Sequence, residues 1–111
     1  MCGRFTLTAT TEAIEQHFNL AELKAHKARY NIAPSQAILT ISQTLQSKGQ
    51  YAYMKWGLVP KWANSKHTKT TWINARSETA AERPAFRQAF AKRRCLIPAD
   101  GYYEWKPMDG K

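Results

Sequence analysis

Two short stretches near the middle of the chain limit the folds it can adopt more than any other feature. Residues 37–42 (AILTIS) and 51–56 (YAYMKW) are rich in β-branched and aromatic side chains, and a polar stretch containing Ser47-Lys48-Gly49 separates them. Apolar runs of this length, bounded by turn-forming residues, are typical of strands, and their spacing predicts one hairpin. We therefore expect an antiparallel sheet.

Segments on either side of this hairpin predict further short elements. Polar and apolar side chains alternate over residues 4–8 (RFTLT), which predicts a short strand. Thr10 or Thr11 can cap a helix that ends near Phe18 and Asn19, because a threonine side chain accepts a hydrogen bond from a free N–H of the first turn. We expect one or two more helical turns over residues 21–28, and an extended or turning segment at residues 31–34.

The second half of the chain predicts one helix and two strands. Thr79 and Glu82 have the spacing of a capping box, and a basic helix is expected over residues 85–91, after Pro84. Residues 95–98 and 102–106 read as strands around an Ala99-Asp100-Gly101 turn, with Cys95 as a buried thiol. The chain is therefore expected to form one α+β domain over residues 1–111, with a mixed, mostly antiparallel, barrel-like curled sheet and a few short helices.

The last residues predict an unpaired strand. Asp109-Gly110 is a strong hairpin turn signal, yet the sequence has only Lys111 after it. Residues 102–106 thus lack the second strand of the hairpin that this turn predicts. We interpret the chain as a domain truncated on its C-terminal side, or one that receives a strand from another chain, and we expect the bare edge to promote self-association.

The sequence argues against several classes of protein: secreted, membrane-spanning, disulfide-rich and metal-binding. Residues 2–8 lack the basic and long apolar regions of a signal peptide, and no apolar run reaches membrane-spanning length. The two cysteines, Cys2 and Cys95, predict a reducing, cytoplasmic environment rather than a disulfide framework. Neither they nor His17, His26 and His67 have zinc-ligand spacing, so we expect no metal and no cofactor.

The net charge of +9 is concentrated in one segment. Residues 51–94 hold ten Lys and Arg against two Glu, and they are also rich in aromatic residues, among them Tyr51, Tyr53, Trp56, Trp62 and Trp72. Basic side chains neutralise phosphates and aromatic rings stack on unpaired bases, so this combination suits single-stranded nucleic acid. A merely basic surface over core tryptophans fits the composition equally well.

Cys2 is the most reactive candidate in the chain. If Met1 is removed, Cys2 carries a free amine and a free thiol on adjacent carbons, with reference pKa values of about 7.7–8.0 and about 8.5. Such a group can trap an aldehyde twice, first as an imine and then as a five-membered thiazolidine ring. An inert small residue at position 2 is the alternative.

Three further residues could carry chemistry. Asn74 and Arg76 lie two apart in WINARSE, and on a strand they would share a face able to hold a hydroxyl and a phosphate. Glu104 lies between Tyr103 and Trp105, and aromatic surroundings favour the protonated carboxyl needed for general acid–base work. Ordinary exposed strand positions account for all three residues as well.

Five blocks of the sequence together resemble one family. MCGRF, YNIAPSQ, KWGLVPKWA, NARSETAAERPAFRQAF and RRCLIPADGYYEWK are similar, in this order, to the SRAP family (SOS response-associated peptidase). The resemblance covers essentially all 111 residues. It implies an intracellular, nucleoid-associated sensor of abasic sites in single-stranded DNA, which removes its own initiator methionine and cross-links the new N-terminal cysteine to the lesion.

The resemblance also implies roles for individual residues. Cys2 would be the double nucleophile, Asn74 would orient the sugar oxygens, and Glu104 would shuttle protons. The residues implied near DNA are Arg4, Pro34 (at the pocket floor), Trp56, Trp62 and Arg76 (on a phosphate). SRAP members also use a later histidine that no residue of this sequence matches. A non-covalent single-strand-binding module and a cysteine-dependent autopeptidase are the alternative functions.

Overall fold

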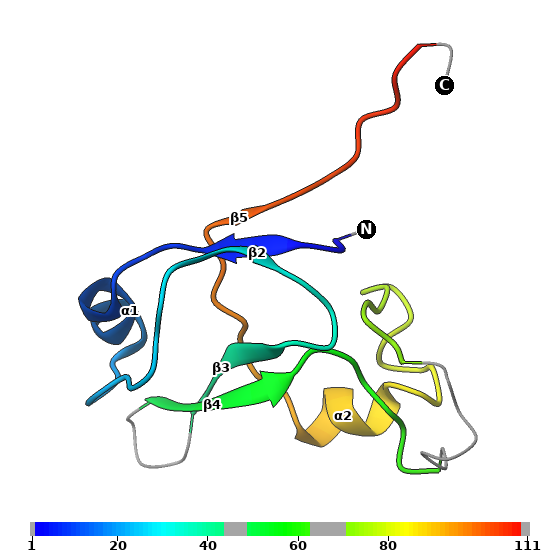
Figure 1. Ribbon diagram of the computed structural model, residues 1–111. Coiled ribbons are helices and arrows are strands. Elements are labelled where there is room, and N and C mark those ends of the chain that lie inside the picture. The colour runs from blue at the N-terminus through cyan, green and yellow to red at the C-terminus, as the bar shows by residue number, and fades with distance from the viewer. Residues whose placement is uncertain (1, 44–48, 63–70, 110–111) are drawn as a thin grey trace.

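The computed structural model describes residues 2–43, 49–62 and 71–109. Its elements follow one another as β1 (Phe5–Leu7), α1 (Thr11–Phe18), β2 (Arg29–Ile32), β3 (Ala37–Gln43), β4 (Gly49–Lys55), α2 (Arg87–Lys92) and β5 (Gly101–Tyr102). The predicted α+β class is confirmed. Figure 1 shows α1 at one end of the molecule and α2 at the other, with the strands between them.

The strands form two antiparallel sheets. The first has the order β2-β1-β5, with Phe5 opposite both Ile32 and Tyr102. The second is the predicted β3–β4 hairpin, in which Leu39 pairs with Tyr53. Every pairing between these strands is antiparallel, and the described strands do not close into a barrel, so the expected barrel-like form is not confirmed.

One hydrophobic core joins the two sheets and α1. Its buried side chains come from β1, α1, the segment after α1, β2 and β3: Phe5, Leu7, Ile14, Leu20, Leu23, Ile32, Ile38, Leu39 and Ile41. The buried hydroxyl of Thr40 donates to the Ala52 carbonyl across the hairpin (2.9 Å), which satisfies its hydrogen-bonding capacity within the core. Strand β1 is therefore packed into the core from Phe5 onward, three residues after Cys2.

The predicted limits of α1 are confirmed. The Thr10 hydroxyl accepts a hydrogen bond from the Ala13 N–H (3.1 Å), and Asn19 ends the helix in the left-handed conformation. Asparagine tolerates this conformation better than most residues, because its short polar side chain can make local hydrogen bonds. Ile14 fixes the buried face of the helix.

The helical turns expected over residues 21–28 are wrong. The backbone groups of this segment bond to side chains outside it: Leu23 N–H to the Glu15 carboxylate (2.8 Å), Lys24 N–H to the Tyr51 hydroxyl (3.0 Å), and the Lys24 carbonyl to the Tyr53 hydroxyl (2.7 Å). These tertiary hydrogen bonds replace the helical ones. The extended or turning segment expected at 31–34 is confirmed, since Asn31 and Ile32 end strand β2 and Pro34 lies in the turn that follows.

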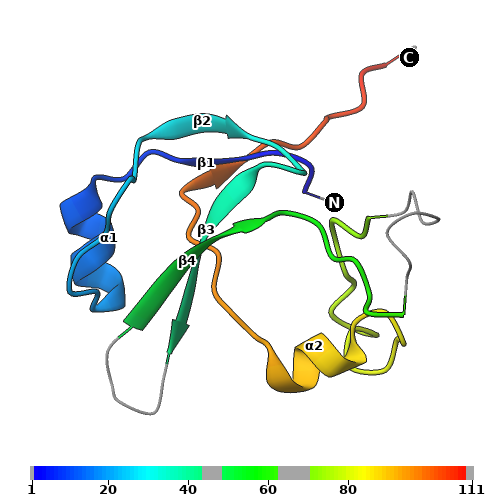
Figure 2. The same cartoon turned by 60° about the horizontal axis from the view of Figure 1, so that its bottom comes forward.

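The C-terminal elements are shorter than predicted. Residues 77–86 form turns, and α2 begins only at Arg87 without a side-chain cap. The expected strand at 95–98 is a single bridge between Leu96 and Ile41 of β3, and the expected strand at 102–106 is reduced to β5. The two segments do not pair with each other, since residues 96–101 cross from the β3 sheet to the β1 sheet (Figures 1 and 2).

Asp100 fastens this crossing to the N-terminal strand. Its carboxylate accepts hydrogen bonds from the Thr6 hydroxyl (2.6 Å), from the N–H (2.5 Å) and hydroxyl (3.0 Å) of Thr8, and from the Ala9 N–H (2.9 Å). These bonds favour the ionised form and lower the pKa of Asp100 to about 2, with the Thr6 hydroxyl as the largest cause. Asp100 therefore acts as a fixed anionic clamp rather than a turn residue alone.

Candidate active site at the N-terminus

The segment that carries Asn74 and Arg76 is fixed by the chain that follows β4. Leu58 and Trp72 exchange two backbone hydrogen bonds, Leu58 N–H to Trp72 (2.8 Å) and Trp72 N–H to Leu58 (3.1 Å). Gly57 precedes this bridge with a φ of 138°, a conformation that side chains rarely adopt, and a Cβ placed there would overlap Thr71 Cγ2. Glycine is thus required where the two segments meet.

Trp56 connects the same segment to the N-terminal strand. Its ring packs edge-on against Phe5 of β1, with ring centroids 5.4 Å apart. Its indole N–H donates to the Ile73 carbonyl (2.8 Å). Residue 73 is thereby held beside β1 by a partly buried side chain that packs against the core.

This arrangement brings Asn74 to Cys2. The Asn74 side-chain amide donates a hydrogen bond to the carbonyl oxygen of Cys2 (2.8 Å). Cys2 itself is partly buried and packs against the core, and its thiol donates to the Arg4 carbonyl at 3.5 Å. Both the backbone and the side chain of the first candidate nucleophile therefore have fixed partners.

Asn74 also lines an open cavity of about 620 Å³. Arg76, Arg83 and Trp62 contribute to the same lining, and no described Asp or Glu does. Trp72 and Phe86 form an edge-to-face aromatic pair in its wall, with ring centroids 5.8 Å apart. Cations, aromatic rings and an amide that reaches Cys2 thus surround one hollow.

The other predicted site residues, Arg4, Glu104 and Pro34, lie on segments different from that of Asn74. Arg4 is exposed, and its guanidinium donates to the Asn31 side chain of β2 (2.9 Å). The Arg4 carbonyl accepts from the N–H of Tyr103 (3.0 Å), so the exposed Glu104 follows directly after a residue paired with the N-terminal strand. Pro34 lies half-buried in the turn between β2 and β3, and the lining of the Asn74 cavity does not include it.

Two expectations about this region are wrong. Residues 73–76 are not a strand, because only Trp72 pairs, although Asn74 and Arg76 still face one cavity. Cys95 is exposed rather than buried, since its segment meets β3 only at Leu96. The described residues contain no group of three or more His, Cys, Asp or Glu able to hold a metal ion, and His67 lies outside them.

Comparison with known proteins identifies the family. The family model described as SOS response associated peptidase (SRAP) matches residues 1–111. The chain belongs to the SRAP family.

Three SRAP relatives that match the chain are named abasic site processing proteins. The chain is 45% identical over 115 residues to the abasic site processing protein YoqW of Bacillus subtilis (strain 168), covering 100% of this chain and 50% of that protein. It is 31% identical to YedK of Escherichia coli (strain K12), with the same coverage. It is also 39% identical over 61 residues to HMCES of Rattus norvegicus, covering 51% of this chain and 17% of that protein.

A solved structure agrees with the SRAP assignment. A phage-related protein from Bordetella bronchiseptica has a TM-score of 0.75 at 30% identity, covering 99% of this chain and 50% of that one. The chain therefore spans about half the length of the YoqW and YedK relatives and of this solved structure. The expectation that it is part of a longer SRAP domain stays a prediction.

Sequence reasoning missed several residues of this SRAP cavity. Arg83 lines it, yet its segment was predicted only as the cap of a helix. Trp72 and Phe86 form a pair in its wall, which the aromatic content of the segment did not indicate. The signal that could have indicated all three is the density of Arg and aromatic residues between positions 72 and 87.

Proposed function

We propose that this chain senses abasic sites in single-stranded DNA and captures them through Cys2 after Met1 is removed. The single observation that carries the proposal is the hydrogen bond from the Asn74 amide to the Cys2 carbonyl, because Asn74 also lines a cationic, aromatic cavity. The names of the relatives, abasic site processing proteins, support the lesion as the partner.

The proposed reaction uses both groups of the terminal cysteine. The free amine of Cys2 attacks the aldehyde carbon of the ring-opened sugar, and loss of one water gives an imine. The thiol then adds to the imine carbon, its proton passes to the nitrogen, and a C–S bond closes the thiazolidine. Aldehyde and aminothiol are converted into ring and water, without an oxidant or a reductant.

The neighbouring side chains have distinct roles in this proposal. Asn74 fixes the N-terminal residue and faces the sugar oxygens. Arg76, supported by Arg83 in the same cavity, binds the phosphate beside the lesion through charge-assisted hydrogen bonds. Glu104 transfers protons during imine formation and ring closure, which need an acid and a base in turn.

Arg4, Pro34, Trp56 and Trp62 divide into two groups in the proposed complex. Arg4 and Trp62 are exposed and suit direct contact with DNA, one by charge and the other by stacking. Pro34 and Trp56 are partly buried and suit support of the site from beneath. This activity would place the protein at cellular DNA.

Two further activities are proposed as weaker candidates. The lining of the Asn74 cavity, which includes no described acidic residue, suits non-covalent binding of single-stranded DNA in addition to cross-linking. Self-removal of Met1 would make the chain an autopeptidase, and mass spectrometry of protein made without methionine aminopeptidase separates this from processing by the host.

Association through the C-terminal segment is also part of the proposal. Residues 104–109 follow Tyr103 and extend away from both sheets (Figure 1), and Trp105 is 97% exposed. Within the described residues, β5 pairs on one side only, with β1. An open strand edge next to an exposed indole favours contact with a second chain.

A denaturing gel tests the main proposal. Met1-processed protein mixed with an abasic single strand is expected to give a slow band, and the same strand with an intact base is expected to give none. Cys2→Ser keeps the amine and removes the thiol, so its imine adduct should dissociate on denaturation. An equally strong band from Cys2→Ser would exclude the ring.

A further inference from the structure

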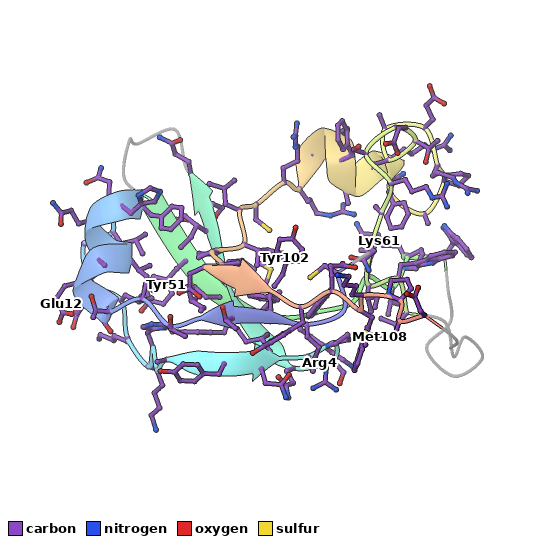
Figure 3. The ribbon with its side chains drawn as sticks, turned by 90° about the horizontal axis from the view of Figure 1, so that it is seen from above. Arg4, Glu12, Tyr51, Lys61, Tyr102 and Met108 are labelled. Carbon is purple, nitrogen blue, oxygen red and sulfur yellow. The ribbon has the colours of Figure 1, made fainter. Side chains whose placement is uncertain are left out.

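A second basic cavity lies beside the one that contains Asn74. It measures about 180 Å³ and lies between residues 58–62 and the start of α2. Lys61, Arg87 and Arg93 line it together with the amide of Gln88, and no described Asp or Glu does. In Figure 3, Lys61 lies toward α2, on the side of the molecule away from Glu12 of α1.

The two cavities share a wall. Trp62, Pro84 and Ala85 line both of them. Trp62 is 70% exposed, so its ring is available for stacking at the ridge between the two hollows. An exposed indole between two cationic hollows is the arrangement that single-strand-binding proteins use to alternate base stacking with phosphate contacts.

The cations of the two cavities follow one another along the chain. The Arg87 N–H donates to the Arg83 carbonyl (2.9 Å), which is a helical four-residue spacing. Arg83 lines the first cavity and Arg87 the second. Arg94 is engaged differently, since its guanidinium stacks over the Phe90 ring at 4.6 Å.

We propose that the second cavity is a phosphate-binding subsite for the same single strand, beyond the nucleotide held at the Asn74 cavity. Lys61, Arg87 and Arg93 bind a backbone phosphate, and Trp62 stacks on the base between the two subsites. The proposal rests on the proposed function for its partner, single-stranded DNA, but it does not depend on the covalent step at Cys2.

The salt dependence of DNA binding tests this subsite. The probe is an undamaged oligothymidylate, titrated over a range of NaCl concentrations by fluorescence anisotropy. The triple variant Lys61→Gln, Arg87→Gln, Arg93→Gln is expected to bind more weakly. The slope of log K against log salt should become shallower by roughly 0.7 for each phosphate of the single strand that the variant no longer neutralises.

Control variants separate a subsite from general loss of charge. Lys24→Gln removes an exposed cation whose backbone N–H bonds to Tyr51, and Tyr51 lies on the opposite side from Lys61 in Figure 3. This variant should keep the wild-type slope. Lys61→Arg combined with Arg93→Lys keeps the charge of the subsite, and this variant should also keep the wild-type slope. All three lysine and arginine positions of the subsite are exposed, so circular dichroism should show an unchanged fold.

The outcomes distinguish this inference from the covalent proposal. An unchanged slope in the triple variant, or an equal loss in Lys24→Gln, would overturn the subsite even if abasic strands cross-link. Wild-type protein with no measurable salt-dependent binding would overturn it as well. A shallower slope in the triple variant, together with no cross-link through Cys2, would leave the subsite standing and reject the covalent proposal.

Discussion

The Asn74 side-chain amide donates a hydrogen bond to the Cys2 carbonyl at 2.8 Å, between residues 72 positions apart in the chain. The bond fixes the orientation of Cys2 relative to a cavity that Asn74 itself lines. Terminal residues are usually poorly ordered unless something ties them down. In the proposed mechanism, this bond pre-organises Cys2 for reaction once Met1 has been removed.

Asn74→Ala is expected to slow cross-linking by about tenfold to hundredfold, because misplacement of a reacting group costs rate steeply. The half-time of band formation at saturating abasic DNA measures the effect. Gln50→Ala, an exposed amide on β4, is the matched control and should react at the wild-type rate. An Asn74→Ala variant as fast as that control would contradict the positioning role.

Gly57→Ala is expected to destabilise the fold by about 1–3 kcal/mol, because the positive φ strains any side chain and the added Cβ would meet Thr71. Urea unfolding followed by tryptophan fluorescence measures the change. Gly3→Ala is the matched control, since a Cβ there meets nothing within 4 Å. Equal stability of both variants would show that a side chain at position 57 causes no strain.

Trp56→Phe should keep most of the packing against Phe5 but lose the hydrogen bond to the Ile73 carbonyl. The expected loss of stability is about 0.5–1.5 kcal/mol, measured by urea unfolding. Cross-linking should also slow, since residue 73 positions Asn74. If the variant loses only DNA affinity, Trp56 contacts DNA instead of supporting the site.

Asp100 predicts a defined acid limit of stability. Its folded-state pKa of about 2 lies below the usual value of 3.8, so the native state holds the ionised form more tightly than the unfolded state does. The stabilisation is fully present above about pH 4 and is lost as pH falls toward 2. The melting temperature of wild-type protein should therefore drop over this range.

Asp100→Asn should reduce that dependence on pH, because the amide cannot ionise. Asp109→Asn, at another exposed aspartate, should retain the wild-type profile. Parallel profiles for wild type and Asp100→Asn between pH 4 and 2 would mean that the hydrogen bonds to Thr6, Thr8 and Ala9 do not depend on the charge.

Association through residues 104–109 predicts a concentration-dependent mass in solution. Light scattering should detect species larger than a monomer, and Trp105→Lys should shift them toward the monomer, because a charge replaces a ring that is 97% exposed. Lys106→Gln leaves the ring in place and should not. A monomer at every concentration would argue against this role of the C-terminal segment.

Local signals in the sequence predicted the elements that local chemistry decides. The Thr10 cap, the Asn19 stop and the β3–β4 hairpin each depend on neighbouring residues, and all three are confirmed. Residues 21–28 were predicted wrongly because their backbone groups bond to Glu15, Tyr51 and Tyr53. Helix propensity does not take account of hydrogen-bond partners that the tertiary structure supplies.

The site was only partly predictable for the same reason. Residues Asn74 and Arg76 were selected as strand neighbours, and they do share a cavity, but turns and the Trp56 indole place them there. Cys95 was expected inside because CLIP is apolar, yet an apolar run does not say what covers it. The hydrogen bond between Asn74 and Cys2 depends on the chain topology, and the distance between the two residues in the sequence does not predict it.

The state of the two cysteines in the cross-linked product tests the central claim most directly. After reaction with an abasic strand, the protein is treated with a thiol-alkylating reagent under denaturing conditions, and its intact mass is measured. The account predicts an adduct of protein plus DNA minus one water, alkylated once, at Cys95. An adduct alkylated at both cysteines would show that the Cys2 thiol is free, and a closed ring through its sulfur would be contradicted.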